Sequence, residues 1–335
     1  MSDDFDSKRR QRFLGEDYFK WMLKSLNDNI AYWSENVAPT GSTENERKAL
    51  TELYRVSDCY QRFLLMFTGG VDISRLRDEF ESVIEAYERY THAQRVHEED
   101  ARQPPLAFSN IGDYEIVMQL IGFCYLLHRR DLLARIVAMF DPAYRGKDTL
   151  YEDLLAYEFE GRIDVDKWYH DVPYRPLVFS LYRDTKEECI ADITEYLEAW
   201  YPGMAAAPGY DSHLEAKKGG KGAYAGYWAI EAAAVAYLLQ LDDSSFRDHL
   251  LYPKDLADFA RNFEAAKEGA SVLESGPKTV RTGQVCPETG VWKAQGHSVP
   301  GVLVHQGERM PEVFAPDRSG AYRSQPALWE FERKA

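Results

Sequence analysis

The sequence predicts a mainly α-helical protein, a bundle or array of about eight to ten helices with a small β-rich appendage at its C-terminal end. Three observations support this prediction. Apolar residues recur at helical spacing as far as about residue 267, the usual start and stop residues flank these runs, and turn residues become dense after Gly276. With 335 residues, 45% of them apolar and 28% charged, the chain has the composition of a folded protein that buries a large core.

The N-terminal helical region, residues 1–105, contains three apolar stripes of helical period. The stripes run from Leu14 to Trp33, from Leu50 to Phe67 and from Ile73 to Tyr90. Thr43 with Glu46 has the spacing of a capping box, Asp72 is suited to an N-cap, and Gly69-Gly70 is a stop signal. We therefore expect three long helices that run antiparallel to one another.

The C-terminal helical region, residues 106–270, begins with a run from Val117 to Leu127 that is apolar on every side, as is typical of a fully enclosed helix. Further helices are expected at 132–140, 148–160, 185–200, 222–241 and 253–267. Thr185 with Glu188 forms a second capping box. In the last region, residues 277–335, short apolar runs alternate with Gly and Pro, which predicts a β-rich appendage.

The formal net charge is −15 and is unevenly distributed. Residues 271–335 contain eight Lys or Arg and seven Asp or Glu, so this part sums to +1 and the preceding 270 residues to −16. An acidic body repels nucleic acid and anionic lipid and favours a basic partner, although solubility alone is a sufficient reason for such a surface. We therefore expect neither a nucleic-acid partner nor a membrane partner.

The sequence shows no sign of export or of membrane insertion. No apolar run approaches the roughly 20 residues of a membrane span, and the first residues lack the apolar run of a signal peptide. The cysteines are far apart and show no CxxC spacing; they are Cys59, Cys124, Cys189 and Cys286. The reduced cytoplasm is the simplest interpretation.

Glu231 is a carboxylate in the middle of an Ala-rich, aromatic run that is predicted to be a buried helix. Such a position is costly unless the carboxylate is paired or hydrogen-bonded. It could act in acid–base catalysis or bind a metal, but no Glu-x-x-His partner accompanies it, as di-metal bundles require. A core carboxylate that is satisfied by a Tyr, Arg or Lys of another helix is the simpler interpretation.

Other candidate sites are weaker still. The Lys217–Gly222 loop lacks the order of a phosphate-binding loop. Cys286, His297 and His305 lack the short paired spacings of structural zinc sites, and no GxSxG motif is present. We therefore expect no cofactor and no metal.

Acidic residues gather on faces opposite the apolar stripes of two predicted helices. The first set is Asp78, Glu81, Glu85 and Glu88, and the second set is Glu188, Asp192, Glu195 and Glu198. A third acidic feature is the pair Asp242-Asp243, although Asp243 or Ser244 could instead cap the following turn. Each stripe is explained by a solvated face, but either could also dock on a cationic surface, such as the phosphate-binding cleft of a nuclease.

The stretch from Gly222 to Leu256 resembles the signature of one bacterial family, the PoNi-type immunity proteins. The residues that carry the resemblance are Gly222, Tyr224, Gly226, Tyr227, Trp228 and Glu231, then Asp242-Asp243, then Tyr252, Pro253 and Asp255. The early helices, with Phe19-Lys20-Trp21, are also similar to this family. The run from Cys286 to Trp292 looks like a tail found on some related toxin-immunity proteins.

The resemblance implies a helical, non-enzymatic protein that binds and neutralises a cognate antibacterial toxin. The toxin would be a DNase or other nuclease, delivered by a type VI or related secretion system, and the inhibitor would occlude its active site or DNA-binding cleft. The alternatives are a helical scaffold for other cellular partners and a helical enzyme that uses Glu231. If the chain is an immunity protein, we expect its signature residues to form a structural frame and its acidic residues to contact the toxin. Such a protein would be a monomer or a homodimer.

Overall fold

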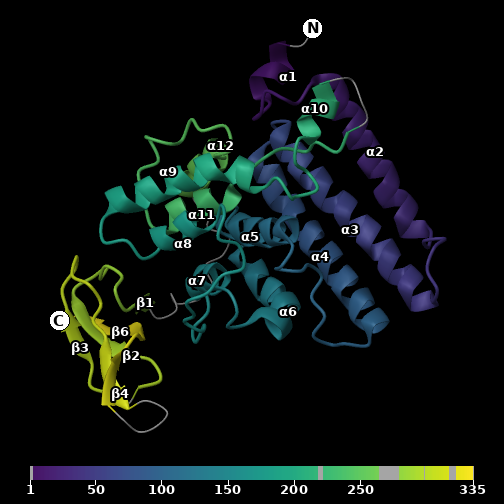
Figure 1. Cartoon of the computed structure of the whole chain (residues 1–335). Helices are drawn as coiled ribbons and strands as arrows, with labels where there is room; N and C mark the ends of the chain where they lie inside the picture. Colours follow the sequence, from purple (N-terminus) through teal and green to yellow (C-terminus); the bar gives the residue numbers. More distant parts are fainter. Residues whose placement is uncertain (1–2, 218–221, 264–278, 298, 317–321, 335) are drawn as a thin grey trace, which may run out of the picture.

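The computed structural model of the chain describes residues 3–217, 222–263, 279–297, 299–316 and 322–334. These residues form twelve α-helices, nine of them with seven or more residues, one short 3₁₀ helix and six β-strands (Figure 1). The helices are α1 (Asp3–Lys8), α2 (Glu16–Glu35), α3 (Glu44–Thr68), α4 (Ile73–Glu98), α5 (Ile111–Leu126), η1 (Arg130–Leu132), α6 (Leu133–Tyr144), α7 (Thr149–Ala156), α8 (Arg175–Ser180), α9 (Lys186–Gly203), α10 (Ser212–Lys217), α11 (Ile230–Leu238) and α12 (Lys254–Asn262). The predicted mainly α-helical class is confirmed.

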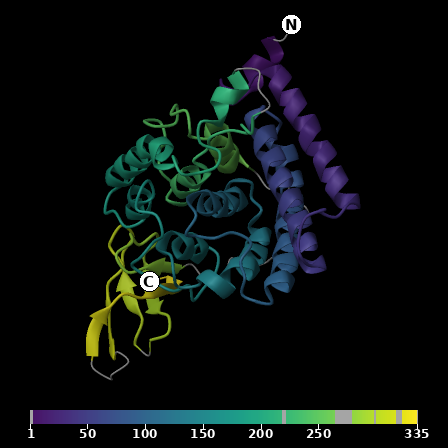
Figure 2. The ribbon, with the colours of Figure 1, turned by 45° about the vertical axis from the view of Figure 1, so that its right-hand side comes forward.

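The long helices α2, α3 and α4 form a layer along one side of the molecule (Figures 1 and 2). Their ends agree with the capping residues of the sequence. The Thr43 side chain accepts a hydrogen bond from the Glu46 N–H, and Asp72 accepts from the first turn of α4. Gly70, at the end of α3, has a φ of +83°, which glycine adopts without strain and which turns the chain back toward α4.

Helix α5 is the centre of the helical body. Twelve of its sixteen residues are buried, as expected for the enclosed run in the sequence. On one side Phe123 makes an edge-to-face contact with Phe63 of α3, with ring centroids 5.1 Å apart. Gly122 packs closely on Ile230: a Cβ at position 122 would lie only 3.0 Å from the Ile230 Cγ2. The absence of a side chain at Gly122 therefore lets α5 and α11 pack close together. The buried apolar residues of both predicted helical regions belong to one contiguous core.

The last part of the chain forms two small antiparallel sheets. Four strands lie in the order β1 (Thr279–Arg281), β6 (Leu328–Lys334), β2 (Gly290–Ala294) and β3 (Val302–Val304), and β4 (Val313–Pro316) pairs with β5 (Tyr322–Gln325). Trp292, Trp329 and Met310 are among the residues of a separate small core. The predicted β-rich appendage is therefore confirmed, and Figure 1 shows it at the end of the molecule away from α2.

Three predicted helix ranges need correction. The helix expected at 148–160 covers only Thr149–Ala156. The helix expected at 222–241 covers only Ile230–Leu238, because residues 222–229 have no regular secondary structure and run between α3, α5 and the N-terminal residues. Gly226 has a φ of +129°, outside the helical region. The helix expected at 253–267 runs from Lys254 to Asn262, and residues 264–267 lie outside the described residues.

Candidate functional site

The irregular 222–229 segment is held by side chains from distant parts of the chain. Gln11, which is 1% exposed, accepts hydrogen bonds at Oε1 from the Tyr227 N–H (2.9 Å) and the Tyr224 hydroxyl (2.6 Å). Its Nε2 donates to the Tyr227 carbonyl oxygen. Buried backbone groups outside helices and sheets need hydrogen-bond partners from elsewhere in the chain. Here the side chain of Gln11 bonds both the backbone N–H and the backbone carbonyl of Tyr227.

Thr68 fixes the next part of the segment. Its hydroxyl accepts a hydrogen bond from the indole N–H of Trp228 at 2.8 Å and donates to carbonyl groups. A Cβ at Gly226 would lie 2.2 Å from the Thr68 Oγ1, so only glycine fits this close approach. The aromatic signature residues are thus anchors of a buried segment.

Glu231 lies in the first turn of α11 and is fully buried. The Tyr196 hydroxyl of α9 donates a hydrogen bond to its Oε1. Burial raises the pKa of Glu231 to about 7, against the opposing effects of Tyr196 and Trp200. No hydrogen bond of standard geometry reaches Oε2 among the described residues, although the Trp200 indole is close enough to lower this pKa. Glu231 is therefore buried and hydrogen-bonded to a tyrosine of another helix, as we expected of a structural carboxylate.

The remaining signature residues also have structural contacts. The Gly222 carbonyl oxygen accepts a hydrogen bond from the Tyr18 hydroxyl at 2.8 Å. Pro253 is the residue before α12. Asp255 forms an ion pair with Arg10 at 3.3 Å, which ties α12 to the N-terminal residues.

In the predicted acidic stripe of α4, two carboxylates are exposed and two are held by arginines of another segment, while exposed Asp78 also lies 3.7 Å from the guanidinium of its neighbour Arg77. The exposed ones are Asp78 and Glu85. Glu81 accepts from Arg129 and from Arg135, both at 2.9 Å, and Glu88 accepts from Arg135 at 2.8 Å. Because Arg129, just before η1, and Arg135 of α6 neutralise half of the stripe, α4 presents less free negative charge than its sequence implies.

In the second acidic stripe, on α9, three of the four carboxylate residues are exposed. Glu188 closes the predicted N-terminal capping box, which is confirmed, and its side chain is exposed. Asp192 is only 7% exposed and pairs with Arg183 at 3.1 Å. Glu195 and Glu198 are exposed and lie further along the same helix.

The acidic pair after α11 is split between surface and interior. Asp242 is exposed, and its Oδ1 accepts a hydrogen bond from the Ser244 backbone N–H at 3.0 Å. The side chain that caps this turn is therefore that of Asp242, and the prediction of Asp243 or Ser244 as the cap was wrong. Asp243 is 2% exposed and accepts from Tyr252 (3.0 Å), Arg261 (2.6 Å) and Arg247 (3.1 Å). Of the pair, only Asp242 presents its carboxylate to solvent.

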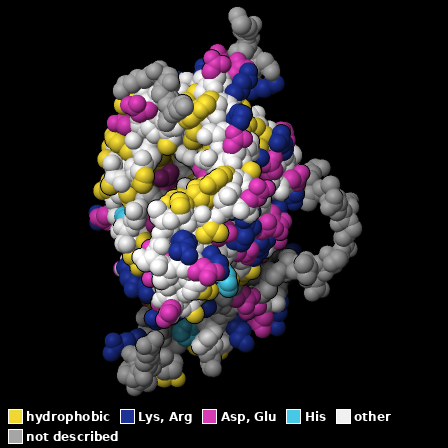
Figure 3. All heavy atoms as spheres, turned by 90° about the vertical axis from the view of Figure 1, so that its right-hand side faces the viewer, with side chains coloured by type: hydrophobic (Ala, Val, Ile, Leu, Met, Phe, Trp, Pro, Cys, Tyr) yellow, Lys and Arg dark blue, Asp and Glu magenta, His cyan; other side chains and the backbone are white. Residues whose placement is uncertain are grey.

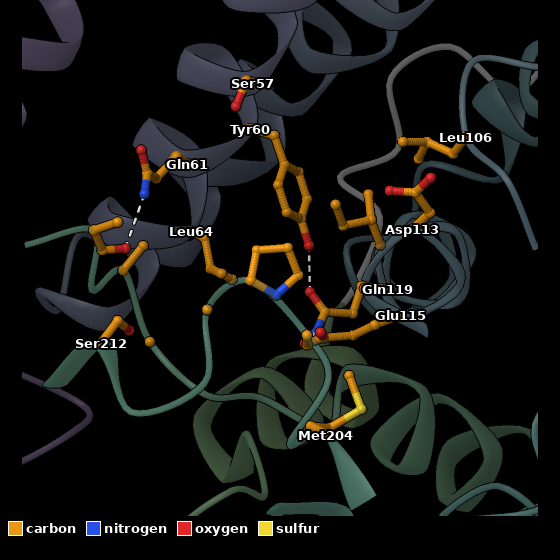
Figure 4. Close-up of a pocket in the computed structure, with 18 of the residues that line it drawn as sticks. Ser57, Tyr60, Gln61, Leu64, Leu106, Asp113, Glu115, Gln119, Met204 and Ser212 are labelled. Carbon is orange, nitrogen blue, oxygen red and sulfur yellow. Dashed lines mark hydrogen bonds between the residues drawn. The ribbon is translucent and has the colours of Figure 1, made fainter. Parts of the chain in front are cut away.

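A cleft of about 310 Å³ opens between α3, α4, the first half of α5, the end of α9 and the segments at 207–212 and 223–227. Figure 3 shows the face at the right of Figure 1, where hydrophobic side chains border a hollow, and Figure 4 shows the cleft in detail. Its walls are mainly aromatic and aliphatic. The Tyr and Trp residues that line it are Tyr60, Tyr87, Tyr90, Trp200, Tyr201, Tyr210 and Tyr227.

Two carboxylates of α5, Asp113 and Glu115, line this cleft, and the sequence interpretation missed both. Burial raises the pKa of Glu115 well above its usual value, and the nearby Glu231 raises it further. The signal was available in the sequence, because Glu115 interrupts an apolar helix just as Glu231 does. What the sequence does not show is the cleft beside it.

The described residues offer no other obvious chemistry. None of their His, Cys, Asp and Glu side chains form a group of three or more that could hold a metal ion. Cys286 is buried in the small core of the sheet region, where its thiol lies near backbone carbonyls. No helix in the described part of the chain is long and apolar enough to span a membrane.

Part of the helical body matches a family of immunity proteins, which are binding proteins that protect a cell from a toxin. Residues 146–256 match the family described as "PoNe immunity proteins (PoNi), C-terminal". The chain therefore carries a PoNi C-terminal immunity domain, which runs from just before α7 to the start of α12 and includes α9, Glu231 and Asp242-Asp243. The family implies that the protein neutralises a cognate toxin of a polymorphic toxin system and that its role is binding.

The crystal structure of protein PA2201 from Pseudomonas aeruginosa has a similar fold. The match covers 76% of this chain and 90% of that chain, with 21% sequence identity and a TM-score of 0.57. At this identity the likeness concerns the fold alone. No curated protein matches the chain.

Proposed function

We propose that the cognate toxin is a nuclease, delivered by a type VI or related secretion system, and that this protein blocks its active site or the entry of DNA. The observation that carries the proposal is the immunity-family match over residues 146–256, combined with a net charge of −15. A nuclease must present a basic cleft to phosphates, and an acidic inhibitor is complementary to that cleft.

The face of α9 is the best candidate for the docking surface. Glu195 and Glu198 are exposed there, and within the described part of the chain no arginine pairs with them, whereas arginines neutralise half of the α4 stripe. The N-terminal end of α9 lies beside the Asp242 turn, since the Lys186 ammonium donates to the Gln240 carbonyl oxygen at 2.8 Å. The exposed carboxylates of α9 and Asp242 belong to the family-matched residues, whereas α4 does not. We define Glu188, Glu195, Glu198 and Asp242 as the α9 acidic face.

Co-expression with the toxin encoded by the neighbouring gene tests the proposal. We expect cells that express the toxin alone to lose chromosomal DNA, and cells that express both proteins to keep it. The two proteins should also co-purify and form a complex of defined stoichiometry. Continued DNA degradation together with failure to co-purify would contradict the proposal. A toxin that is neutralised but cleaves no nucleic acid would contradict only its nuclease part.

A further inference from the structure

The described lining of the cleft has the composition of a site for an organic cation. It contains seven Tyr or Trp side chains and the carboxylates of Asp113 and Glu115, and no Lys, Arg or His. Aromatic faces attract ammonium and guanidinium groups through their negative π-surface, and carboxylates complete such sites. The volume of about 310 Å³ is at the lower end of the range for ligand pockets, so it suits one long side chain.

The floor of the cleft is held in place before any partner arrives. The Gln119 amide donates to the Glu115 Oε1 at 2.8 Å and to the Trp228 carbonyl oxygen at 2.7 Å. Its own oxygen accepts from the Tyr60 hydroxyl, as Figure 4 shows. A carboxylate that is fixed in this way loses little side-chain entropy when it pairs with a cation.

The electrostatics of the floor also favour a cation. Glu115 lies near the fully buried Glu231, whose charge opposes the ionisation of Glu115 and raises its pKa. Asp113 lines the same cleft and accepts a hydrogen bond from the Ala107 N–H at 2.9 Å. A guanidinium or ammonium in the cleft would compensate this concentration of carboxyl groups.

The cleft is continuous with the α9 acidic face. Tyr201 lines the cleft and lies three residues after Glu198, so the two side chains share one face of the helix. Trp200, the preceding residue, lies in the wall of the cleft. A basic partner that docks along α9 therefore reaches the mouth of the cleft.

We propose that the cleft receives an arginine or lysine side chain of the toxin, with Glu115 as its ion-pair partner and the surrounding aromatic rings as its walls. This inference rests on the proposed function. It adds that the complex has a buried cationic anchor, in addition to the exposed charges of α9.

Two matched pairs of variants test the anchor against the toxin. Glu115→Gln removes the charge but keeps the size and an acceptor for Gln119, and Glu85→Gln on exposed α4 is its control. Ser57→Trp fills the cleft from an exposed position on α3, and Ser82→Trp on α4 is its control. We expect Glu115→Gln and Ser57→Trp each to weaken toxin binding by roughly 30-fold or more, mainly through faster dissociation. The controls should bind within about twofold of the unmodified protein.

A small probe tests the cleft without the toxin. N-acetyl-arginine methylamide should shift the NMR signals of the Gln119 side-chain amide and the Trp200 indole N–H, with weak, saturable binding that is lost in Glu115→Gln. N-acetyl-norleucine methylamide, which lacks the charge, is the matched control and should cause smaller shifts.

The outcomes separate this inference from the proposed function. If the unmodified protein binds the toxin and both cleft variants bind equally well, the anchor is wrong and the proposed function stands. If the probe causes no charge-dependent shift, the cleft is not a cation site. Failure of the unmodified protein to bind the toxin contradicts the proposed function and the toxin anchor together, whatever the probe shows.

Discussion

The Tyr196 hydroxyl of α9 donates a hydrogen bond to the carboxyl group of Glu231 in α11, and both residues are completely buried. This contact joins two helices of the immunity domain. Glu231 is also the residue that the sequence most readily suggested as a catalytic group. Since burial raises the pKa of Glu231 to about 7, the carboxyl group takes up a proton on folding over much of the range below neutral pH.

Glu231 should make the protein less stable as the pH rises. Its pKa is about 7 in the folded chain and near the ordinary 4.5 in the unfolded chain. The folded state therefore binds more protons at this group between these values, so the contribution of Glu231 to stability is greatest below about pH 4.5 and is lost as the pH rises to about 7. Replacing it by glutamine should reduce the loss in unfolding free energy between pH 5 and pH 8 by roughly 2–3 kcal/mol. Urea denaturation at a series of pH values measures this loss.

The matched control for this prediction is Glu85→Gln, which removes an exposed carboxylate of α4. It should leave the pH dependence of the unfolding free energy nearly unchanged. Equal pH dependence in the Glu231 variant and the unmodified protein would show that Glu231 is ionised in the folded state at a normal pKa.

Gly226 should be far less tolerant of substitution than Gly209. An alanine at position 226 would combine a φ of +129° with a Cβ 2.2 Å from the Thr68 Oγ1. We expect Gly226→Ala to lower the unfolding free energy by about 3 kcal/mol or more, as strained and overpacked positions do. Gly209 has open space around its Cβ position, so Gly209→Ala should change stability by less than about 1 kcal/mol. Similar denaturation midpoints for the two variants would contradict this assignment.

The helices were predictable where their apolar stripes and caps were both clear. Helices α2, α3, α4 and α9 lie where periodicity placed them, because one face of each is buried and the other is solvated. The 222–229 segment was mistaken for helix, since a buried irregular segment can be as apolar as a buried helix. Its partner Gln11 is separated from Tyr227 by 216 positions, so no local pattern could reveal it.

The candidate site was only partly predictable for the same reason. Spacing identified the acidic face of α4, but it could not show that Arg129 and Arg135 neutralise Glu81 and Glu88. The fully buried environment of Asp243 depends on Tyr252, Arg247 and Arg261, which reach it from beyond its own turn. The cleft is made by segments from several distant parts of the chain, so its existence follows only from the fold.

Arg281 should fix the C-terminal sheet region to the helical body. This residue of β1 forms an ion pair with Asp153 of α7, and the two side chains are 10% and 6% exposed. Burial raises the pKa of Asp153 to about 6, while Arg281 and Tyr182 act in the opposite direction. Loss of one partner from a buried pair costs on the order of 3–5 kcal/mol, because the other charge remains buried.

We expect Arg281→Met to increase the hydrogen-exchange rates of the amides in β1, β2 and β6, above pH 6 most of all. Lys293→Met, at an exposed position of β2, is the control and should leave them unchanged. If Arg281→Met leaves exchange unchanged but weakens toxin binding, the sheet region contacts the toxin and does not depend on this ion pair for its attachment.

Charge reversal should show which acidic surface docks on the toxin. Replacing Glu195 and Glu198 by lysine changes the net charge by the same amount as replacing Asp78 and Glu85, and all four residues are exposed on helices. We expect the α9 variant to bind the toxin at least tenfold more weakly, with a slower association rate and a weaker dependence on salt, because local complementarity steers the encounter. The α4 variant should show only the small change that follows from net charge. Surface plasmon resonance at several salt concentrations measures both rates, and equal losses in the two variants would mean that only the overall charge matters.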